Sequence, residues 1–351
     1  LSNCIFMDRK EAHLFAENEA GININGIYHY DNNSAIKWIA EQSSEWIPLE
    51  YGNPEQLKVQ LESPGEGWHQ DDDVLDTWFS SGQWVYATLE AWNLKDTFFP
   101  TDVLVSAHDI LENWDSRMMM FTNFHEKENP NGNHPFDNLF LTGLVLGTDG
   151  QKMSKSKGNM IDMDKIVGEY GTDAVRMVYF YQNKAGGNYA ITFDKLKNFK
   201  QFMNKIWNAS KFVMMNNEKF NDKGHTLRDF QSSENEVVQT IYTDLLETKA
   251  KVTTNINDYE FGYATETLYD KFWHTFCDQH IEFAKGTLMS EEVDAETKKE
   301  ICDVLIFALK EYLKMLHPFI PFITQMIWDD LMSDDRRKVD GDHKVLMYSR
   351  W

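Results

Sequence analysis

Short apolar runs alternate with helical stretches in the middle of the chain. The segments DVLVSA at 102–107 and NLFLTGLVL at 138–146 are apolar and rich in strand-forming residues, as buried parallel strands are. Between them, residues 109–125 place large apolar side chains at helical spacing: Ile110, Trp114, Met118 and Phe121. A strand, a helix and a second strand in succession predict a βαβ unit, which is typical of an α/β fold.

The chain beyond this unit lacks strand-like alternation and carries helical patterns instead. Residues 162–182 predict two short helices around Gly171. Further along, the periodicity predicts helices at 194–216, 233–256, 260–285, 292–316 and 319–332, with loops at 221–225 and 285–292. A helical bundle is therefore expected in this part.

The first 69 residues are mixed and weakly patterned. Residues 21–30 and 46–51 are compatible with short strands, and turn-forming residues surround them. We therefore divide the chain into a connector at 1–69, an α/β part at 70–193 and a helical part at 194–351.

The overall charge argues against a general polyanion-binding surface. The chain has 56 acidic and 34 basic residues, a net charge of −22, so a nucleic acid would have to meet local basic patches. Cys4, Cys277 and Cys302 stand apart without metal-ligand spacing, which argues against a disulfide framework or a structural zinc and for a reducing compartment. No apolar run is long enough to span a membrane.

One short segment concentrates positive charge in this acidic chain. Residues 149–162, DGQKMSKSKGNMID, hold Lys152, Lys155 and Lys157 between two glycines, and we call them the lysine loop. The loop follows the second predicted strand directly, so it leaves from the edge of the sheet where ligands bind. Flexible lysines between glycines suit a loop that closes on a polyphosphate. By composition alone, a solvated linker would look the same.

Several motifs in and around the lysine loop resemble those of the class I aminoacyl-tRNA synthetases. They occur in that family's order and at similar spacing: DVLDTWFSSGQW at 73–84, FLTGLVLGTDGQKMSKSKGNMID at 140–162 with KMSKS at 152–156, YGTDAVR at 170–176 and NKIWNASKFV at 204–213. The resemblance covers roughly residues 70–332. It implies an α/β fold class, namely the C-terminal half of a Rossmann-like catalytic domain followed by an all-α anticodon-binding bundle.

The resemblance also assigns residues that would bind ATP and the amino acid. Lys152 and Lys155 would hold the ATP phosphates and act in catalysis, and the other expected ATP contacts are Ser154, Ser156, Gly143 and Leu144. The expected amino-acid pocket consists of Trp78, Asp109, Ile110, Trp114 and Asp76. The alternatives are that the two tryptophans are core residues, that Asp109 caps a helix and that Asp76 is a loop charge.

The basic stripe on residues 195–211 is the candidate tRNA-binding surface. Lys200, Lys205 and Lys211 are the residues expected to meet phosphates, while Leu196, Phe199, Met203, Ile206 and Trp207 turn inward. A lysine-flanked surface helix without a ligand has the same pattern. No metal-binding residues are expected.

The function that the resemblance implies is amino-acid activation and tRNA charging. The motifs at 73–82 and 204–213 are more similar to the valine-specific members of the family than to the isoleucine- or leucine-specific ones. The expected ligands are valine, ATP with Mg²⁺ and tRNA(Val), in a cytoplasmic and monomeric enzyme that also edits mischarged tRNA.

The chain also departs from the family's pattern. It has no HIGH-like tetrapeptide, and it begins without an initiator Met, so it reads as a partial chain that is inactive by itself, with residues 1–69 at the end of the family's inserted region. Three alternatives stay open: an isoleucine- or leucine-specific enzyme, a catalytically incomplete RNA-binding fragment, and an unrelated nucleotidyltransferase with a similar loop.

Overall fold

The computed structural model describes residues 76–125, 134–147, 150–153, 161–220, 230–334 and 342–351, together with the backbones of five short strands before residue 76. These strands are β1 (Cys4–Asp8), β2 (Glu11–Phe15), β3 (Ile27–His29), β4 (Leu57–Val59) and β5 (His69–Gln70). β1 and β2 form an antiparallel pair, and β3 lies between β4 and β5, antiparallel to both. The strand expected at 21–30 is confirmed by β3, whereas 46–51 lies outside the described residues.

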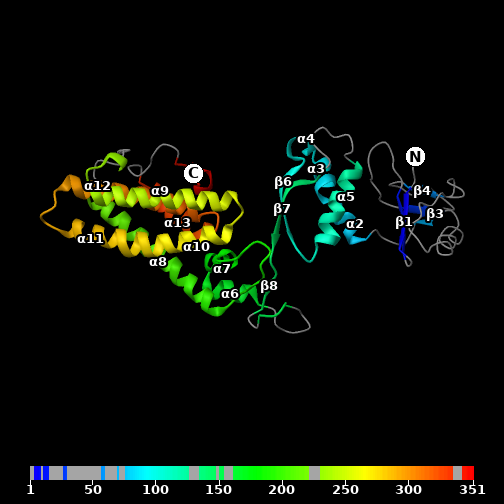
Figure 1. Ribbon diagram of the computed structural model, residues 1–351, viewed down its shortest axis with the longest axis horizontal. Helices are drawn as coiled ribbons and strands as arrows, with labels where there is room; N and C mark the ends of the chain where they lie inside the picture. Colours follow the sequence, from blue (N-terminus) through cyan, green and yellow to red (C-terminus); the bar gives the residue numbers. More distant parts are fainter. Residues whose placement is uncertain are drawn as a thin grey trace. The chain divides into compact units, whose positions relative to one another are not determined.

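The chain divides into two compact units. The first unit comprises residues 1–101 and 112–135, and the second comprises residues 102–111 and 136–351. In the first unit lie α2 (Thr77–Gly82), α3 (Trp84–Ala91), α4 (Lys95–Phe98) and α5 (Ser116–His125), the last preceded by the π-helical turn η2 (Leu111–Asp115) (Figure 1). The helix expected at 109–125 is thus confirmed in its C-terminal part and begins with a π turn.

Helix α2 packs on α5 through an aromatic contact and a glycine. The rings of Phe79 and Phe121 meet edge to face with centroids 5.3 Å apart. Gly82 is buried, and a Cβ there would come within 2.8 Å of the Phe121 ring. The absence of a side chain at Gly82 therefore lets the two helices approach closely.

Two short parallel strand pairs carry the α/β part of the second unit. β6 (Thr101–Ala107) pairs with β7 (Phe136–Thr142). Asn138 donates to the carbonyl of Asp102 and Thr142 donates to that of Ser106, a constant offset of 36 residues that defines a parallel register.

The second pair corrects one expectation. β8 (Val145–Leu146) runs parallel to β9 (Tyr189–Ala190), so the apolar run 138–146 is two strands rather than one. The break falls at Gly143, where any side chain would overlap the carbonyl group of Gly187. The backbone changes its strand partner at this point.

Two short helices follow the lysine loop, as the sequence predicts. α6 (Met163–Tyr170) begins at Asp162, whose side chain accepts from the Lys165 N–H, and it ends at Gly171. Gly171 has φ of 89°, a conformation that glycine adopts without strain, and α7 (Thr172–Phe180) starts directly after it. The turn at Gly171 therefore sets the angle between the two helices.

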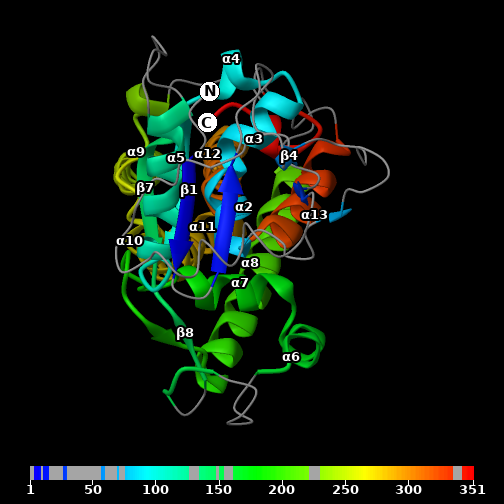
Figure 2. The same ribbon diagram turned by 90° about the vertical axis from the view of Figure 1, so that its right-hand side faces the viewer.

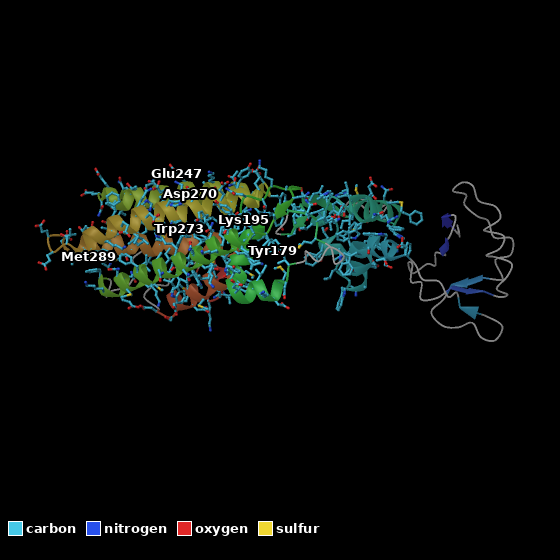
Figure 3. All side chains as sticks on the ribbon, turned by 90° about the horizontal axis from the view of Figure 1, so that it is seen from below. Tyr179, Lys195, Glu247, Asp270, Trp273 and Met289 are labelled. Atoms are coloured by element: carbon cyan, nitrogen blue, oxygen red, sulfur yellow. The ribbon has the colours of Figure 1, made fainter. Side chains whose placement is uncertain are left out.

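The C-terminal part is a helical bundle. Its long helices are α8 (Phe193–Phe220), α9 (Glu236–Asn257), α10 (Phe261–Asp270), α11 (Glu282–Met289), α12 (Ala295–Leu316) and α13 (Pro321–Met332). The π-helix η5 (Lys271–Ile281) joins α10 to α11, and the 3₁₀ turns η4 (Phe230–Ser232) and η7 (Leu346–Tyr348) flank α9 and α13. Figure 2 shows the same ribbon turned by 90°. Helices α8 and η5 pack against each other, and Figure 3 labels one residue of each, Lys195 on α8 and Trp273 on η5.

Most of the expected helices are confirmed, but the loop expected at 285–292 is wrong in its first half. Residues 285–289 form the end of α11, and a helical Gly286 is tolerated there because Ala284 and Leu288 are buried in the core. The loop expected at 221–225 lies outside the described residues. No described helix is both long and apolar enough to cross a bilayer.

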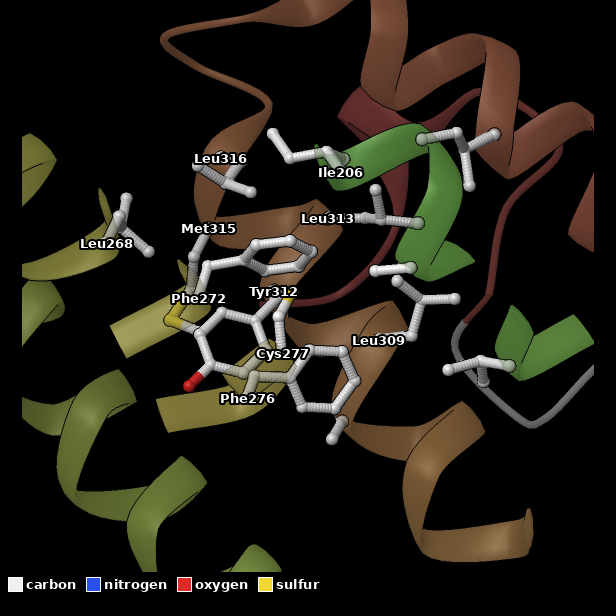
Figure 4. Close-up of a cluster of buried hydrophobic side chains, with 14 of the residues drawn as sticks. Ile206, Leu268, Phe272, Phe276, Cys277, Leu309, Tyr312, Leu313, Met315 and Leu316 are labelled. Atoms are coloured by element: carbon white, nitrogen blue, oxygen red, sulfur yellow. The ribbon is translucent and has the colours of Figure 1, made fainter. Parts of the chain in front are cut away.

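The core of the bundle is apolar and aromatic, with α12 at its centre. The rings of Phe272, Phe276 and Tyr312 pack with centroids 5.2 to 5.4 Å apart, beside Leu309 (Figure 4). Cys277 lies among them, and burial raises the pKa of its thiol to about 12. The thiol is therefore protonated and unreactive at neutral pH.

A buried charge cluster ties the segment 342–351 to the bundle. The ammonium group of Lys310 lies 2.6 Å from the carboxylate of Asp342, and both side chains are at most 3% exposed. The indole N–H of Trp328 donates to the carbonyl of His343 at 2.8 Å, and Leu346 is buried. Residues 342–346 are thus part of the packed structure.

Candidate functional site at the lysine loop

The start of the lysine loop folds back along β8. Lys152 forms a backbone bridge with Leu146, and the Gly147 N–H donates to the carbonyl of Gln151 at 2.9 Å. Gly150 has φ of 72° and donates its N–H to Gly147. This tight reversal holds Lys152 beside the end of the strand. Ser154, Lys155 and Ser156 lie outside the described residues.

The structure brings together one expected phosphate-binding residue and one expected pocket residue. The ammonium group of Lys152 lies 3.4 Å from the carboxylate of Asp109. Asp109 follows the carboxyl end of β6, and the turn there is closed by the Ile110 N–H, which donates to Ala107 at 3.1 Å. Because the Lys152 side chain is 67% exposed, water screens this ion pair. The contact is therefore one that a ligand can readily replace.

Gly143 and Leu144 are held by the segment before β9. The Leu144 N–H donates to the Asn188 side chain at 2.8 Å, and the Leu144 carbonyl accepts from Tyr189 at 3.1 Å. Gly143 contacts the backbone of Gly187 so closely that only glycine fits. In this structure both backbone hydrogen-bonding groups of Leu144 are used within the protein, and these bonds fix the backbone ahead of the lysine loop.

The remaining expected pocket residues lie in the first unit. Asp76 caps α2 by accepting from the Trp78 N–H at 3.2 Å. Trp114 is half-buried, and its indole N–H donates to the Ser81 carbonyl at 2.9 Å. The three residues Asp76, Trp78 and Trp114 are thus organised around α2, while Asp109 and Ile110 belong to the second unit.

The three expected tRNA-binding lysines have different surroundings on α8. Lys205 pairs with Asp278 at 2.8 Å, which raises the pKa of Lys205, and its ammonium group lies over the Trp273 ring. Lys200 donates to the carbonyl of Glu169 at 2.7 Å. Lys211 lies over the Trp207 ring at 5.3 Å. The Asp278 carboxylate therefore reduces the positive potential at Lys205.

Asp173 and Arg176 make long-range contacts that the sequence alone does not indicate. Asp173 is buried and accepts from the backbone N–H groups of Phe322 and Ile323 at the start of α13. Burial raises the pKa of Asp173, although these two N–H groups oppose the change. Arg176 donates to the carbonyls of Pro318 and Phe319. The YGTDAVR motif was the available signal, but its partners lie more than 140 residues away.

Two protein-family models match this chain, one over its α/β part and one over its helical part. Residues 22–192 match the model of tRNA synthetases class I (I, L, M and V), and residues 238–351 match the anticodon-binding domain of tRNA ligase. The chain belongs to the class I aminoacyl-tRNA synthetase family. Its fold class, the catalytic part followed by a helical anticodon-binding part, is confirmed.

The most similar proteins include ligases for one amino acid. The chain is 38% identical to the valine–tRNA ligase of Pelagibacter ubique (strain HTCC1062) over 287 residues, which is 80% of this chain and 31% of that protein. It is 37% identical to the valine–tRNA ligase of Enterococcus faecalis (strain ATCC 700802 / V583) over 317 residues, 88% of this chain and 34% of that protein. The chain therefore spans about a third of the length of the curated relatives it matches.

Solved structures share the fold. The LeuRS of Agrobacterium radiobacter K84, in a ternary complex with tRNA and LeuAMS, matches 82% of this chain and 35% of that chain with a TM-score of 0.65 and 18% identity. The methionyl-tRNA synthetase of Mycobacterium tuberculosis, bound by methionyl-adenylate, matches 69% of this chain and 46% of that chain with a TM-score of 0.52 and 16% identity. At these identities the likeness concerns the fold.

Proposed function

We propose that the chain acts as part of a valine–tRNA ligase, which activates valine with ATP to valyl-adenylate and transfers the valyl group to tRNA(Val). The observation that carries this proposal is the Lys152–Asp109 contact at the carboxyl end of β6. It places the cation expected to bind phosphate beside the carboxylate expected to bind an ammonium group, in a chain whose relatives are named valine–tRNA ligases.

In this proposal the lysine loop acts on the triphosphate. Lys152 and Lys155 counter the negative charge that builds up on the departing pyrophosphate, and Ser154 and Ser156 offer hydroxyl donors. Gly143 and Leu144 contribute the closely packed backbone from which the loop starts. No covalent nucleophile is required, because catalysis comes from positioning and charge stabilisation.

Asp109 takes the ammonium group of valine. When ATP draws Lys152 toward its phosphates, the 3.4 Å contact opens and the Asp109 carboxylate becomes available to a second cation. The resemblance to the synthetase family assigns the apolar walls that measure the side chain to Ile110, Trp78 and Trp114. In such a slot one methylene changes binding by about 1–3 kcal/mol, which separates valine from isoleucine only in part. Asp76 supports the wall by capping α2.

Mg²⁺ enters with ATP in this proposal. Among the described residues, no group of three or more His, Cys, Asp or Glu side chains is gathered so that it could hold a metal ion. A magnesium ion that enters with ATP is bound mainly by phosphate oxygens and needs few protein ligands.

The tRNA would lie along the helical part. Lys200 and Lys211, with Lys205 in a lesser role, would meet its phosphates on α8, a helix that lies between the two regions matched by family models. We further propose that the enzyme is monomeric, works in the cytoplasm and edits mischarged tRNA.

The decisive experiment is ATP–pyrophosphate exchange with a full-length enzyme that contains this chain, with valine, isoleucine or leucine as substrate. We expect valine to give the highest kcat/KM and Lys152→Ala and Lys155→Ala each to lower the exchange rate about a hundredfold, the size typical for loss of one group that stabilises transition-state charge. Lys285→Ala is the matched control, since Lys285 pairs with Glu282 on the bundle surface. Unchanged exchange in both loop variants, or a preference for another amino acid, would contradict the proposal.

A further inference from the structure

The junction between α7 and α13 is a built contact between distant parts of the second unit. Asp173, only 6% exposed, receives the Phe322 N–H at 3.4 Å and the Ile323 N–H at 2.6 Å on its two carboxylate oxygens. These are N–H groups of the first turn of α13, which lack partners within their own helix. Asp173 therefore caps a helix that begins about 150 residues further along the chain.

Arg176 completes the junction one turn further along α7. Its guanidinium donates to Phe319 at 2.7 Å and to Pro318 at 3.0 Å, the carbonyls in the turn between α12 and α13. The Phe180 ring, one turn beyond Arg176, packs on the Phe319 ring with centroids 5.2 Å apart. On α7, the Asp173 carboxylate thus accepts from N–H groups and the Arg176 guanidinium donates to carbonyl groups around the start of α13. The two kinds of bond together define the position and the orientation of α7 relative to α13.

Helix α6 precedes this junction in the chain. The loop ends at Asp162, which caps α6, and α6 leads through Gly171 into α7. Lys200 on α8 donates to the Glu169 carbonyl at the end of α6, so the bundle also holds this helix. Hydrogen bonds therefore join α6 to α8, and α7 to the turn that starts α13.

We propose that Asp173 and Arg176 are positioning residues that hold α7 and the start of α13 in one register, and that transfer of the aminoacyl group to tRNA depends on them while adenylate formation does not. This inference rests on the proposed function. Adenylate formation joins two small molecules within the catalytic part. Transfer also needs the end of a tRNA whose body is held by the bundle, and a misplacement of about 1 Å at the reacting atoms can lower a rate about a hundredfold.

The test compares two activities of the full-length enzyme in variants of the junction. Asp173→Ala and Arg176→Ala are expected to leave ATP–pyrophosphate exchange within about twofold of the parent and to lower kcat/KM for tRNA in aminoacylation at least tenfold. Asp173→Asn keeps an oxygen that accepts the Ile323 N–H, so it should recover most of the aminoacylation. Asp294→Ala is the matched control, because Asp294 caps α12 from its own chain neighbourhood through Glu296 and Thr297.

Two results would overturn the inference. Unchanged aminoacylation in both alanine variants would show that the junction does not position tRNA, and an equal fall of exchange and aminoacylation would assign it a merely structural role. An enzyme that activates isoleucine or leucine instead of valine would refute the proposed function but not this inference. In that case, exchange and aminoacylation would be compared with the amino acid that the enzyme activates.

Discussion

Replacing Gly143 by alanine should open the strand connection that carries the lysine loop. The added Cβ would overlap the carbonyl group of Gly187 and lie 2.8 Å from the Asn188 nitrogen. These are backbone atoms, so no side-chain rotation relieves the overlap, and the segments at 143 and 187 must separate.

The size of the effect follows from the hydrogen bonds between these segments. Gly186 donates to Leu141 at 2.7 Å, Tyr189 donates to Leu144 at 3.1 Å, and Leu144 donates to the Asn188 side chain at 2.8 Å. At about 1 kcal/mol for each bond, their loss lowers the free energy of local opening by about 3 kcal/mol. Since 1.4 kcal/mol is a factor of ten, the amides should exchange about a hundredfold faster.

Native-state hydrogen exchange measures this opening at the amides of Leu144, Gly186 and Tyr189. The matched control is Gly168→Ala, because Gly168 lies inside α6 with open space around its Cα, and alanine there should stabilise the helix by about 0.5–1 kcal/mol. If Gly143→Ala leaves these amides as protected as in the parent, the close packing of Gly143 on Gly187 does not hold the connection and our reasoning is wrong.

Two further predictions concern the bundle. Asp342→Asn removes the carboxylate that lies 2.6 Å from the buried ammonium group of Lys310. The free energy of unfolding, measured in urea, should fall by about 3–5 kcal/mol and recover in the double variant Lys310→Met, Asp342→Leu. A loss below about 1 kcal/mol would contradict this prediction. Burial holds the pKa of His280 below its ordinary value of 6.5, so the unfolded chain takes up a proton where the folded chain does not. Stability should therefore be full above pH 6.5 and fall as the pH drops through that value, more steeply in the parent than in His280→Gln, and equal slopes in thermal melts would refute the assignment.

The helical bundle was largely predictable from the sequence, because apolar residues recur at helical spacing on the faces that are buried in the bundle. Leu196, Phe199 and Ile206 recur at helical spacing and are all buried on α8. The error at 285–289 arose because a local glycine signal was outweighed by the burial of Leu288, which depends on the neighbouring helices.

The candidate site was predictable only where a motif is local. The turn at Lys152 and its position after a strand follow from neighbouring residues, whereas its contact with Asp109 spans 43 residues. Lys205 shows the limit most clearly, since its partner Asp278 lies 73 residues away and nothing in the helical pattern indicates which acidic residue faces it. Side-chain partners across helices depend on packing, which no single segment encodes.

The long-range cap at Asp173 bears on how the helical part can be isolated. A fragment that starts at residue 194 would keep every helix of the bundle but lose the carboxylate that receives the Phe322 and Ile323 N–H groups. Loss of one cap typically removes about 1 kcal/mol, and the start of α13 would fray. Expression of the helical part should therefore begin before α6 rather than at α8, so that α7 can bind the N–H groups in the first turn of α13.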